Sequence, residues 1–133
     1  MKNKIHTIEV ENNETQSVEK IIEKIRENKI IYIKNKFYED KDVLDTITEN
    51  GPAIILNSSG SSGKPRKCFH HLDNLKLSAT TSGQWLIEQG FELQNCLILN
   101  TLPLNHISGL MPIFRSQTWG CDCINISPNL IKK

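Results

Sequence analysis

The chain has 133 residues, of which 38% are hydrophobic and 23% are charged, and its net charge is +1 at pH 7. This length fits one domain or part of one. The balanced charge excludes an overall electrostatic field that would draw nucleic acid or an anionic membrane to the protein. We therefore expect a small-molecule partner, and neither a nucleic acid nor a membrane.

The N-terminus and the cysteines indicate a cytoplasmic protein. The polar start at residues 1–4 leads into no apolar core of signal-peptide length, and no run approaches the length of a membrane span. The cysteines at positions 68, 96, 121 and 123 form no Cys-x-x-Cys pair, and no histidine pair stands at zinc spacing. Cys121 and Cys123 lie two apart, which places both on one face of a strand. We interpret them as ordinary buried thiols in a reducing compartment and expect no metal site.

The first 50 residues predict a leader of short alternating elements. The expected elements are a strand at 5–10, a helix at 17–28, a strand at 30–33 and a helix at 40–50. Ser17 is a suitable N-cap for the first helix. Gly51-Pro52 is the expected stop signal for the second helix.

The second half is more regular and predicts strands that alternate with helices. The expected elements are a strand at 53–56, a helix at 73–89, a strand at 96–99, a helix at 108–119 and a strand at 121–126. Asp73 is the expected cap of the first of these helices, and Pro112 is tolerable only in the first turn of the second. This order predicts a parallel sheet with right-handed crossovers.

The run SSGSSGKPRK, from Ser58 to Lys67, lies between a strand and a helix, which is an arrangement that holds phosphate. Small residues let the backbone approach an anion, and Lys64, Arg66 and Lys67 supply positive charge. The spacing matches neither a Walker loop nor a dinucleotide fingerprint. A plain Ser/Gly linker is the alternative, but the basic residues and the helix that follow favour phosphate binding.

A second motif, LPLNHISGL at residues 102–110, follows the first in order. Together the two motifs closely resemble those of the adenylate-forming enzymes, which include acyl- and aryl-CoA synthetases, luciferases and peptide-synthetase adenylation domains. That superfamily has the signatures Ser/Thr-Ser-Gly-Ser/Thr-Ser/Thr-Gly-x-Pro-Lys-Gly and Leu-Pro-Leu-aromatic-His-x-x-Gly-Leu. Residues 54–120 carry the resemblance. The stretch His106–Leu110 and the short leader look most like the o-succinylbenzoate–CoA ligases of menaquinone and phylloquinone synthesis.

The resemblance implies an α/β fold, the partial N-terminal subdomain of the adenylate-forming fold, with a mostly parallel sheet and flanking helices. Residues 1–50 would be the leader, and residues 51–133 an incomplete AMP-binding ligase subdomain. The implied activity is an AMP-forming acid–CoA ligase that uses ATP, Mg²⁺ and coenzyme A. A carboxylate attacks the α-phosphorus of ATP, and CoA then displaces AMP from the acyl-adenylate.

Site residues follow from the same resemblance, position by position. The phosphate-loop and nucleotide candidates are Ser58, Ser59, Gly60, Ser61, Ser62, Gly63, Lys64, Arg66 and Asn74. The candidate catalytic residue is His106, which matches the histidine near the carboxylate substrate and the α-phosphate. Arg66 stands where the family has lysine, Lys67 where it has glycine, and Asn105 where it has an aromatic residue.

Several side chains also have a purely structural interpretation. His70 matches the histidine of a His-x-x-x-Asn pattern that ends at Asn74, but His70 and His71 could equally begin a helix as solvated residues. We interpret Trp85 and Trp119 as core residues.

The later signatures of the superfamily, Tyr-Gly-x-Thr-Glu and Thr-Gly-Asp, are not found in the sequence. We therefore expect an N-terminal piece of a longer ligase, either a truncated reading frame or a fragment, which a second chain could complete. A non-catalytic ATP- or phosphate-binding module and a degenerate remnant remain as alternatives.

We predict that the 133 residues alone have no measurable acyl-CoA ligase activity, because the sequence has no counterpart of the adenine and ribose signatures. Purified chain with ATP, Mg²⁺, CoA and o-succinylbenzoate is the assay. Formation of the acyl-CoA would contradict the prediction.

Overall fold

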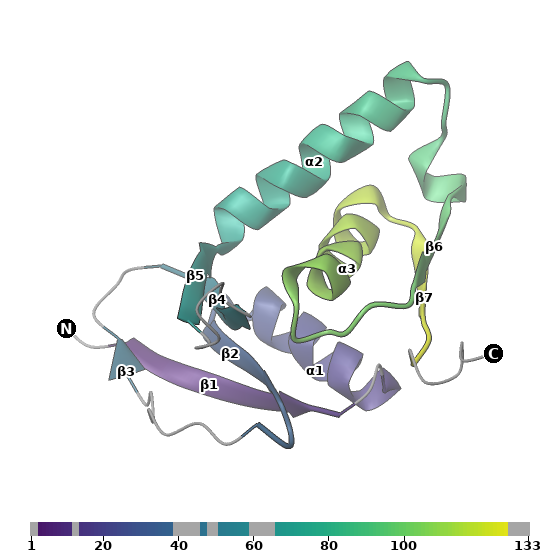
Figure 1. Ribbon diagram of the computed structural model, residues 1–133. Coiled ribbons are helices and arrows are strands. Elements are labelled where there is room, and N and C mark those ends of the chain that lie inside the picture. Colours follow the sequence, from purple (N-terminus) through teal and green to yellow (C-terminus); the bar gives the residue numbers. More distant parts are fainter. Residues whose placement is uncertain (1–2, 12–13, 39–45, 48–50, 59–65, 128–133) are drawn as a thin grey trace.

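The computed structural model describes residues 3–11, 14–38, 46–47, 51–58 and 66–127 (Figure 1). In chain order the elements are β1 (Asn3–Val10), α1 (Thr15–Arg26), β2 (Ile30–Asn35), β3 (Thr46–Ile47), β4 (Ala53–Ser58), β5 (Arg66–His71), α2 (Leu72–Glu88), the 3₁₀ turn η1 (Leu93–Asn95), β6 (Leu97–Asn100), α3 (Ile107–Trp119) and β7 (Asp122–Asn125). Within these ranges, no helix is both long enough and apolar enough to cross a membrane.

The larger sheet has five strands in the order β3-β1-β2-β4-β5. Its centre is parallel, because β2 pairs in parallel with both β1 and β4, while β3 and β5 run antiparallel at the two edges. Residues 30–33 and 53–56 are buried on both faces, which explains their unbroken apolar sequences. The pairing of β2 with β4 joins residues on both sides of position 51 in one sheet.

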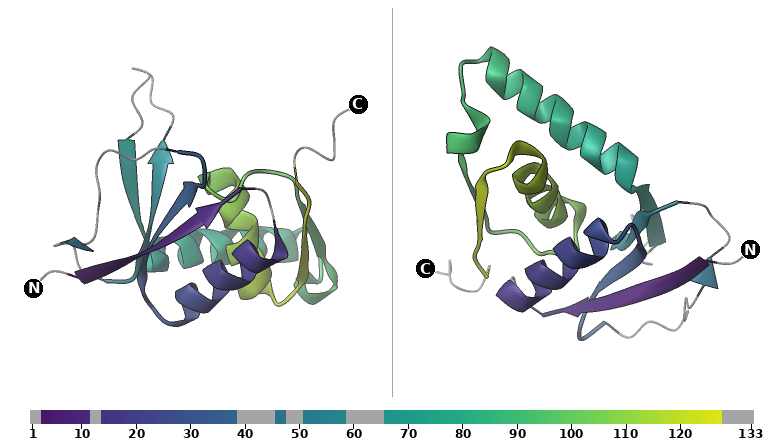
Figure 2. Two further views of the ribbon diagram at one scale, coloured as in Figure 1. Left: turned by 90° about the horizontal axis from the view of Figure 1, so that it is seen from below. Right: turned by 180° about the vertical axis from the view of Figure 1, so that it is seen from behind.

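The three helices lie on the same side of this sheet (Figure 2). Alternate strand residues, among them Ile31, Ile33 and Ile54, form the main core with buried residues of α1, α2 and α3. The opposite face buries a smaller cluster that includes Tyr32 and Ile55, against which Phe69 of β5 packs. The mixed α/β class, with a parallel sheet and flanking helices, is therefore confirmed.

Strands β6 and β7 form a separate parallel pair, connected through α3. The predicted single sheet through residues 53–56, 96–99 and 121–126 is thus wrong. An unpredicted strand, β5, occupies the edge next to β4, so β6 has no place there. His70 lies within β5, whereas His71 is both the last residue of β5 and the N-cap of α2. The expected cap, Asp73, is thus wrong, because it lies in the first turn of α2.

Three further local predictions need correction. Ser17 lies inside α1 and is buried, and the N-cap is Glu14, because the helix starts earlier than its apolar spacing suggests. Thr46–Ile47 is a strand paired with β1, where we expected a helix at 40–50; the rest of that helix lies outside the described residues. Pro112 is the sixth residue of α3, beyond its first turn, and it is buried; α3 continues through it with one backbone hydrogen bond fewer.

The side chain of Asn100, only 2% exposed, connects four segments around the start of α3. Its Nδ2 donates to the carbonyl of Gly109 at 2.8 Å and to Oδ1 of Asn125 at 2.9 Å. Its Oδ1 accepts a hydrogen bond from the N–H of Leu102 at 3.2 Å. One amide therefore joins β6, the loop after it, α3 and β7.

Gly109 allows α3 to approach that loop closely. A Cβ atom at this position would lie 1.9 Å from the carbonyl oxygen of Pro103. Because the obstacle is backbone, no rotation of a side chain could make room for it. The glycine of the second sequence motif therefore has a packing role that holds residues 103–109 in a tight turn.

We predict that Asn100→Ala lowers the free energy of unfolding by about 2–4 kcal/mol, because buried partners of the amide lose their hydrogen bonds. Urea unfolding followed by circular dichroism measures this. The matched control is Asn95→Ala, whose amide makes an exposed 2.6 Å hydrogen bond to Glu92, and we expect less than about 1 kcal/mol there. Equal effects of the two substitutions would contradict the role of Asn100.

Candidate functional site

A pocket of about 340 Å³ opens between the end of β4 and the start of α3. Its lining residues are Leu56, Asn57, Ser58, Cys68, His70, His106, Ile107 and Ser108. Parallel strands of open α/β sheets commonly present ligands at their carboxyl ends, and β4 is such a strand. The pocket therefore brings Ser58, the first residue of the Ser/Gly run, together with His106 and Ser108 of the second motif.

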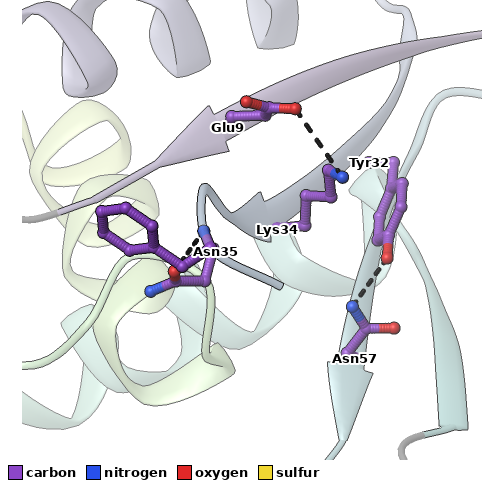
Figure 3. A network of polar contacts seen from close by, with 6 residues as sticks. Glu9, Tyr32, Lys34, Asn35 and Asn57 are labelled. Carbon is purple, nitrogen blue, oxygen red and sulfur yellow. Dashed lines mark hydrogen bonds and ion pairs between the residues drawn. The ribbon is translucent and has the colours of Figure 1, made fainter. Parts of the chain in front are cut away.

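The end of β4 also makes a polar contact with β2 on the sheet face opposite the helices, where Tyr32 lies. Nδ2 of Asn57 donates a 2.7 Å hydrogen bond to the hydroxyl of Tyr32, as Figure 3 shows. Nζ of Lys67 lies 5.7 Å from the centre of the Tyr32 ring, within range of a cation–π interaction. The Oδ1 atom of Asn57 is buried and accepts no hydrogen bond from the described residues.

The helix side of the pocket begins at His106, the N-cap of α3. Its carbonyl accepts hydrogen bonds from the N–H groups of Gly109 at 3.0 Å and Leu110 at 2.9 Å. The N–H groups of Ile107 and Ser108 belong to the first turn of α3, where no helical carbonyl is positioned to accept a hydrogen bond from them. Together with the helix dipole, these N–H groups make the start of α3 favourable for an anion.

His70 contributes a neutral imidazole to the pocket. It lies on β5, opposite Ile54 of β4, and is partly buried. Burial lowers the pKa of His70 below its ordinary value of 6.5. At neutral pH this side chain therefore offers one donor and one acceptor, and no positive charge.

The sequence-predicted site residues fall into four groups. Ser58, the last residue of β4, and His106 line the pocket together. Arg66 begins β5, is exposed and pairs with Ser58 in the strand register. Asn74 lies on α2 and lines a different cavity. The remaining candidates, Ser59–Lys64, lie outside the described residues.

Sequence reasoning did not identify Asn57, Cys68 or Ser108 as pocket residues. Asn57 directly precedes the Ser/Gly run, and Ser108 lies inside the second motif, so both had a positional signal. Cys68 had none, because its place depends on the hairpin that pairs it with Leu56.

The second cavity is a groove of about 740 Å³ along α2 and α3. Its lining residues are Asn74, Leu77, Ser78, Thr81, Ser82, Trp85, Leu86, Arg115 and Trp119. Trp119 is partly buried, and its indole N–H donates to the carbonyl of Ala79 at 2.7 Å. Trp85 is 59% exposed, so its assignment to the core is wrong. The groove is lined by apolar side chains of α2, among them the exposed Leu77 and Trp85, so apolar surface of this helix faces outward in the described structure.

The described residues do not supply a magnesium site. No carboxylate lines the 340 Å³ pocket, and no group of three or more His, Cys, Asp or Glu side chains in the described ranges could hold a metal. Magnesium prefers carboxylate and phosphate oxygens. The donors in this pocket are instead suited to an anion.

Comparison with known proteins supports the resemblance that the motifs suggest. No protein-family model matches the chain. It is 25% identical over 91 residues to the long-chain-fatty-acid–CoA ligase ACSBG1 of Rattus norvegicus, and likewise to that of Mus musculus. The match covers 68% of this chain and 13% of each ligase.

Among solved structures, the fold matches o-succinylbenzoate CoA synthetase (MenE) from Bacillus subtilis. The complex of that enzyme with the acyl-adenylate intermediate OSB-AMP gives a TM-score of 0.55 at 18% identity, over 90% of this chain and 42% of that chain. The complex with ATP and magnesium ion gives 0.55 at 16% identity, over 92% and 44%. The chain therefore has part of the adenylate-forming fold, and it spans less than half the length of these matched structures.

We predict that the stability of the protein falls as the pH is lowered through 6.5, partly because of His70. The folded state disfavours the protonated imidazole, so the unfolded state binds the proton first and gains stability as pH falls. His70→Gln should make the acid loss of stability shallower, by less than about 1.4 kcal/mol per pH unit, the limit for one proton. Thermal melts between about pH 8 and about pH 5, a range that brackets the ordinary histidine pKa, measure the slope.

His6 is the matched comparison, because its pKa is also lowered, first by burial and then by Lys24 and other lysines. His6→Gln should independently reduce the loss of stability per pH unit, and the variant with both substitutions should show the smallest loss. An unchanged slope in His70→Gln would contradict a neutral, partly buried His70.

Proposed function

We propose that this chain forms the phosphate-binding part of an AMP-forming acid–CoA ligase. The observation that carries the proposal is the pocket in which Ser58, next to the Ser/Gly run, meets His106 at the start of α3. A hydroxyl, an imidazole and the positive end of a helix converge there. This set of donors suits the phosphates of a nucleotide.

In the proposed reaction, a carboxylate oxygen attacks the α-phosphorus of ATP and pyrophosphate leaves. The sulfur of coenzyme A then attacks the acyl carbon, and AMP leaves. Ser58 donates its hydroxyl to a phosphate oxygen, and the first N–H groups of α3 stabilise negative charge at the same place. His106 lies near both the carboxylate and the α-phosphate, and its imidazole donates a hydrogen bond to an oxygen of the reacting groups. Ser59–Gly63 grip the β- and γ-phosphates, as the family resemblance implies.

The acid that we propose is 2-succinylbenzoate, which would place the protein in menaquinone or phylloquinone synthesis in the cytoplasm. Two features support this choice. The motif His106–Leu110 resembles that branch of the superfamily, and the matched solved structures are MenE complexes. Magnesium would enter with ATP, and no step assigned to the residues of this chain depends on it.

We further propose that the rest of the ligase fold, supplied by a second chain, packs on the apolar surface of α2 and the β6–β7 pair. Leu77 and Trp85 on α2 are 64% and 59% exposed, and Leu97 and Leu99 on β6 are 62% and 59% exposed. Parallel sheets are normally covered on both faces, whereas α3 covers only one face of this pair among the described residues. The part of MenE without a counterpart in this chain exceeds half of its length.

A non-catalytic phosphate-binding module is the second candidate function. It is favoured by one observation, that the described pocket has anion donors but no carboxylate. On this alternative the chain would bind ATP or pyrophosphate without turnover. The two candidates share the same pocket and differ only in whether a completed ligase releases AMP.

We predict that the chain binds ATP and that Ser58→Ala and His106→Gln each weaken binding by about tenfold, since each removes a hydrogen bond to a charged phosphate. Isothermal titration calorimetry with ATP and with pyrophosphate measures the dissociation constants. The matched control is His6→Gln, because His6 lies in another cavity with Asn3 and Lys29.

Equal affinity of the wild type and the two pocket variants would contradict the proposed site. ATP binding without AMP release, even after addition of a completing ligase chain, would favour the non-catalytic module.

A further inference from the structure

Three of the four cysteines gather at one small sheet, the parallel pair β6–β7. In its register Leu97 faces Asp122, Ile98 faces Cys123 and Asn100 faces Asn125. Cys96 and Cys121 are the residues that immediately precede this ladder, one on each strand. They therefore stand beside each other at the end of the sheet where both strands begin.

The side chains of this pair point to the same face. Leu97, Leu99, Asp122 and Ile124 are exposed, so the alternate residues turn inward toward α3. Cys96 lies two residues before Ile98, and Cys121 lies two residues before Cys123, so both fall on the inward face by the same alternation. Cys121 is 9% exposed, and Cys96 is partly exposed.

One inward pair on this ladder is joined by a side-chain contact. Asn100 and Asn125, the pair at the opposite end, are joined by a 2.9 Å hydrogen bond. Neighbouring strands lie about 4.8 Å apart, which is within the range of Cα separations that a disulfide spans. Burial is the larger cause of the raised pKa of Cys121, and Cys96 raises this pKa further. The effect of Cys96 agrees with a short distance between the two residues.

The backbone on both sides of the pair is held by hydrogen bonds. The N–H of Cys96 donates to the carbonyl of Leu93 at 3.0 Å. The N–H of Cys121 donates to the carbonyl of Ser116 at 3.3 Å, and its own carbonyl accepts from Oγ of Ser116 at 2.6 Å. The thiol of Cys96 itself donates to the carbonyl of Glu92 at 3.4 Å, so this weak hydrogen bond must break before the sulfur can bond to Cys121.

We propose that Cys96 and Cys121 form a peroxide-sensitive thiol pair that closes to a disulfide in the folded protein. Such a bond would tie together the two ends of segment 96–121, which contains α3 and the pocket residue His106. Its formation does not depend on the proposed ligase function.

The chemistry needs only hydrogen peroxide. The thiolate of Cys96, the more exposed sulfur, attacks a peroxide oxygen to give a sulfenic acid, and hydroxide leaves and takes up a proton to become water. The sulfur of Cys121 then attacks the sulfenic sulfur, the S–S bond forms, and the oxygen leaves as a second water with the thiol proton. Two thiols and one peroxide give one disulfide and two waters, and a thiol reductant reverses the change. Because burial raises the pKa of Cys121, the second step should become faster as the pH rises above neutrality.

The test is peroxide treatment of the full chain, followed by alkylation of free thiols, trypsin digestion and mass spectrometry without reductant. Cleavage after Lys76, Arg115 and Lys132 places Cys96 in the peptide 77–115 and the other two thiols of the sheet in 116–132. We expect a loss of about 2 Da from the intact protein and a cross-link between these two peptides. We also expect the melting temperature to rise by about 5–10 °C in the oxidised form.

Variants identify the partner. Cys123→Ser and Cys68→Ser should keep the cross-link, whereas Cys96→Ser and Cys121→Ser should abolish it. A cross-link that needs Cys123, or oxidation to sulfinic acid with no cross-link, would overturn the proposal. Where a variant fails to fold, fragmentation of the cross-linked wild-type peptides decides between these outcomes, because backbone cleavage at Asp122 separates Cys121 from Cys123. Unchanged ATP binding by the oxidised chain would leave the proposal standing, and a failure of ATP binding by the reduced chain would count only against the proposed ligase function.

Discussion

The buried amide of Asn100 is the interaction on which the second half of the molecule depends. It stands at the end of β6 and hydrogen-bonds to the loop after it, to α3 and to β7. A buried amide with these partners permits few arrangements, because any shift leaves a polar group without water and without a partner. Gly109 completes the constraint, since its lack of a Cβ lets the carbonyl of Pro103 approach. The position of His106 at the mouth of the pocket follows from these two residues.

The pocket itself combines a strand end with a helix start. β4 is buried on both faces and ends at Ser58, while α3 begins just after His106. A sheet core and a helix dipole therefore meet at one point, and the donors there are preorganised by secondary structure. Preorganisation of this kind suits the binding of phosphate, and it is the physical basis of the proposed ligase function. The surface of α2 and of β6–β7 remains apolar in the described structure, in agreement with a fold of which this chain has only part.

Much of the local structure could be predicted from sequence pattern. The apolar runs at 30–33 and 53–56 identified buried strands, and helical spacing identified α1, α2 and α3 within a few residues. β5 escaped prediction because RKCFHH is basic, lacks alternation and follows a Ser/Gly run that suggested a loop before a helix. Its strand character comes from pairing with β4 along six residues, which is a tertiary effect. The same hairpin brought His70 to the pocket and separated β4 from β6.

The sequence by itself determined the two motifs, their order and the residue types that a phosphate site needs. It also determined the small residue at 109 and the polar residue at 100, whose local chemistry allows only a few environments. Only the tertiary structure decided which of these residues meet. Ser58 and His106 share a pocket, Asn74 lines a separate groove, and Cys96 and Cys121 precede two paired strands, because strand register and helix packing act between segments that are distant along the chain. Periodicity describes one segment at a time, and such contacts arise only when several segments bury their apolar faces together.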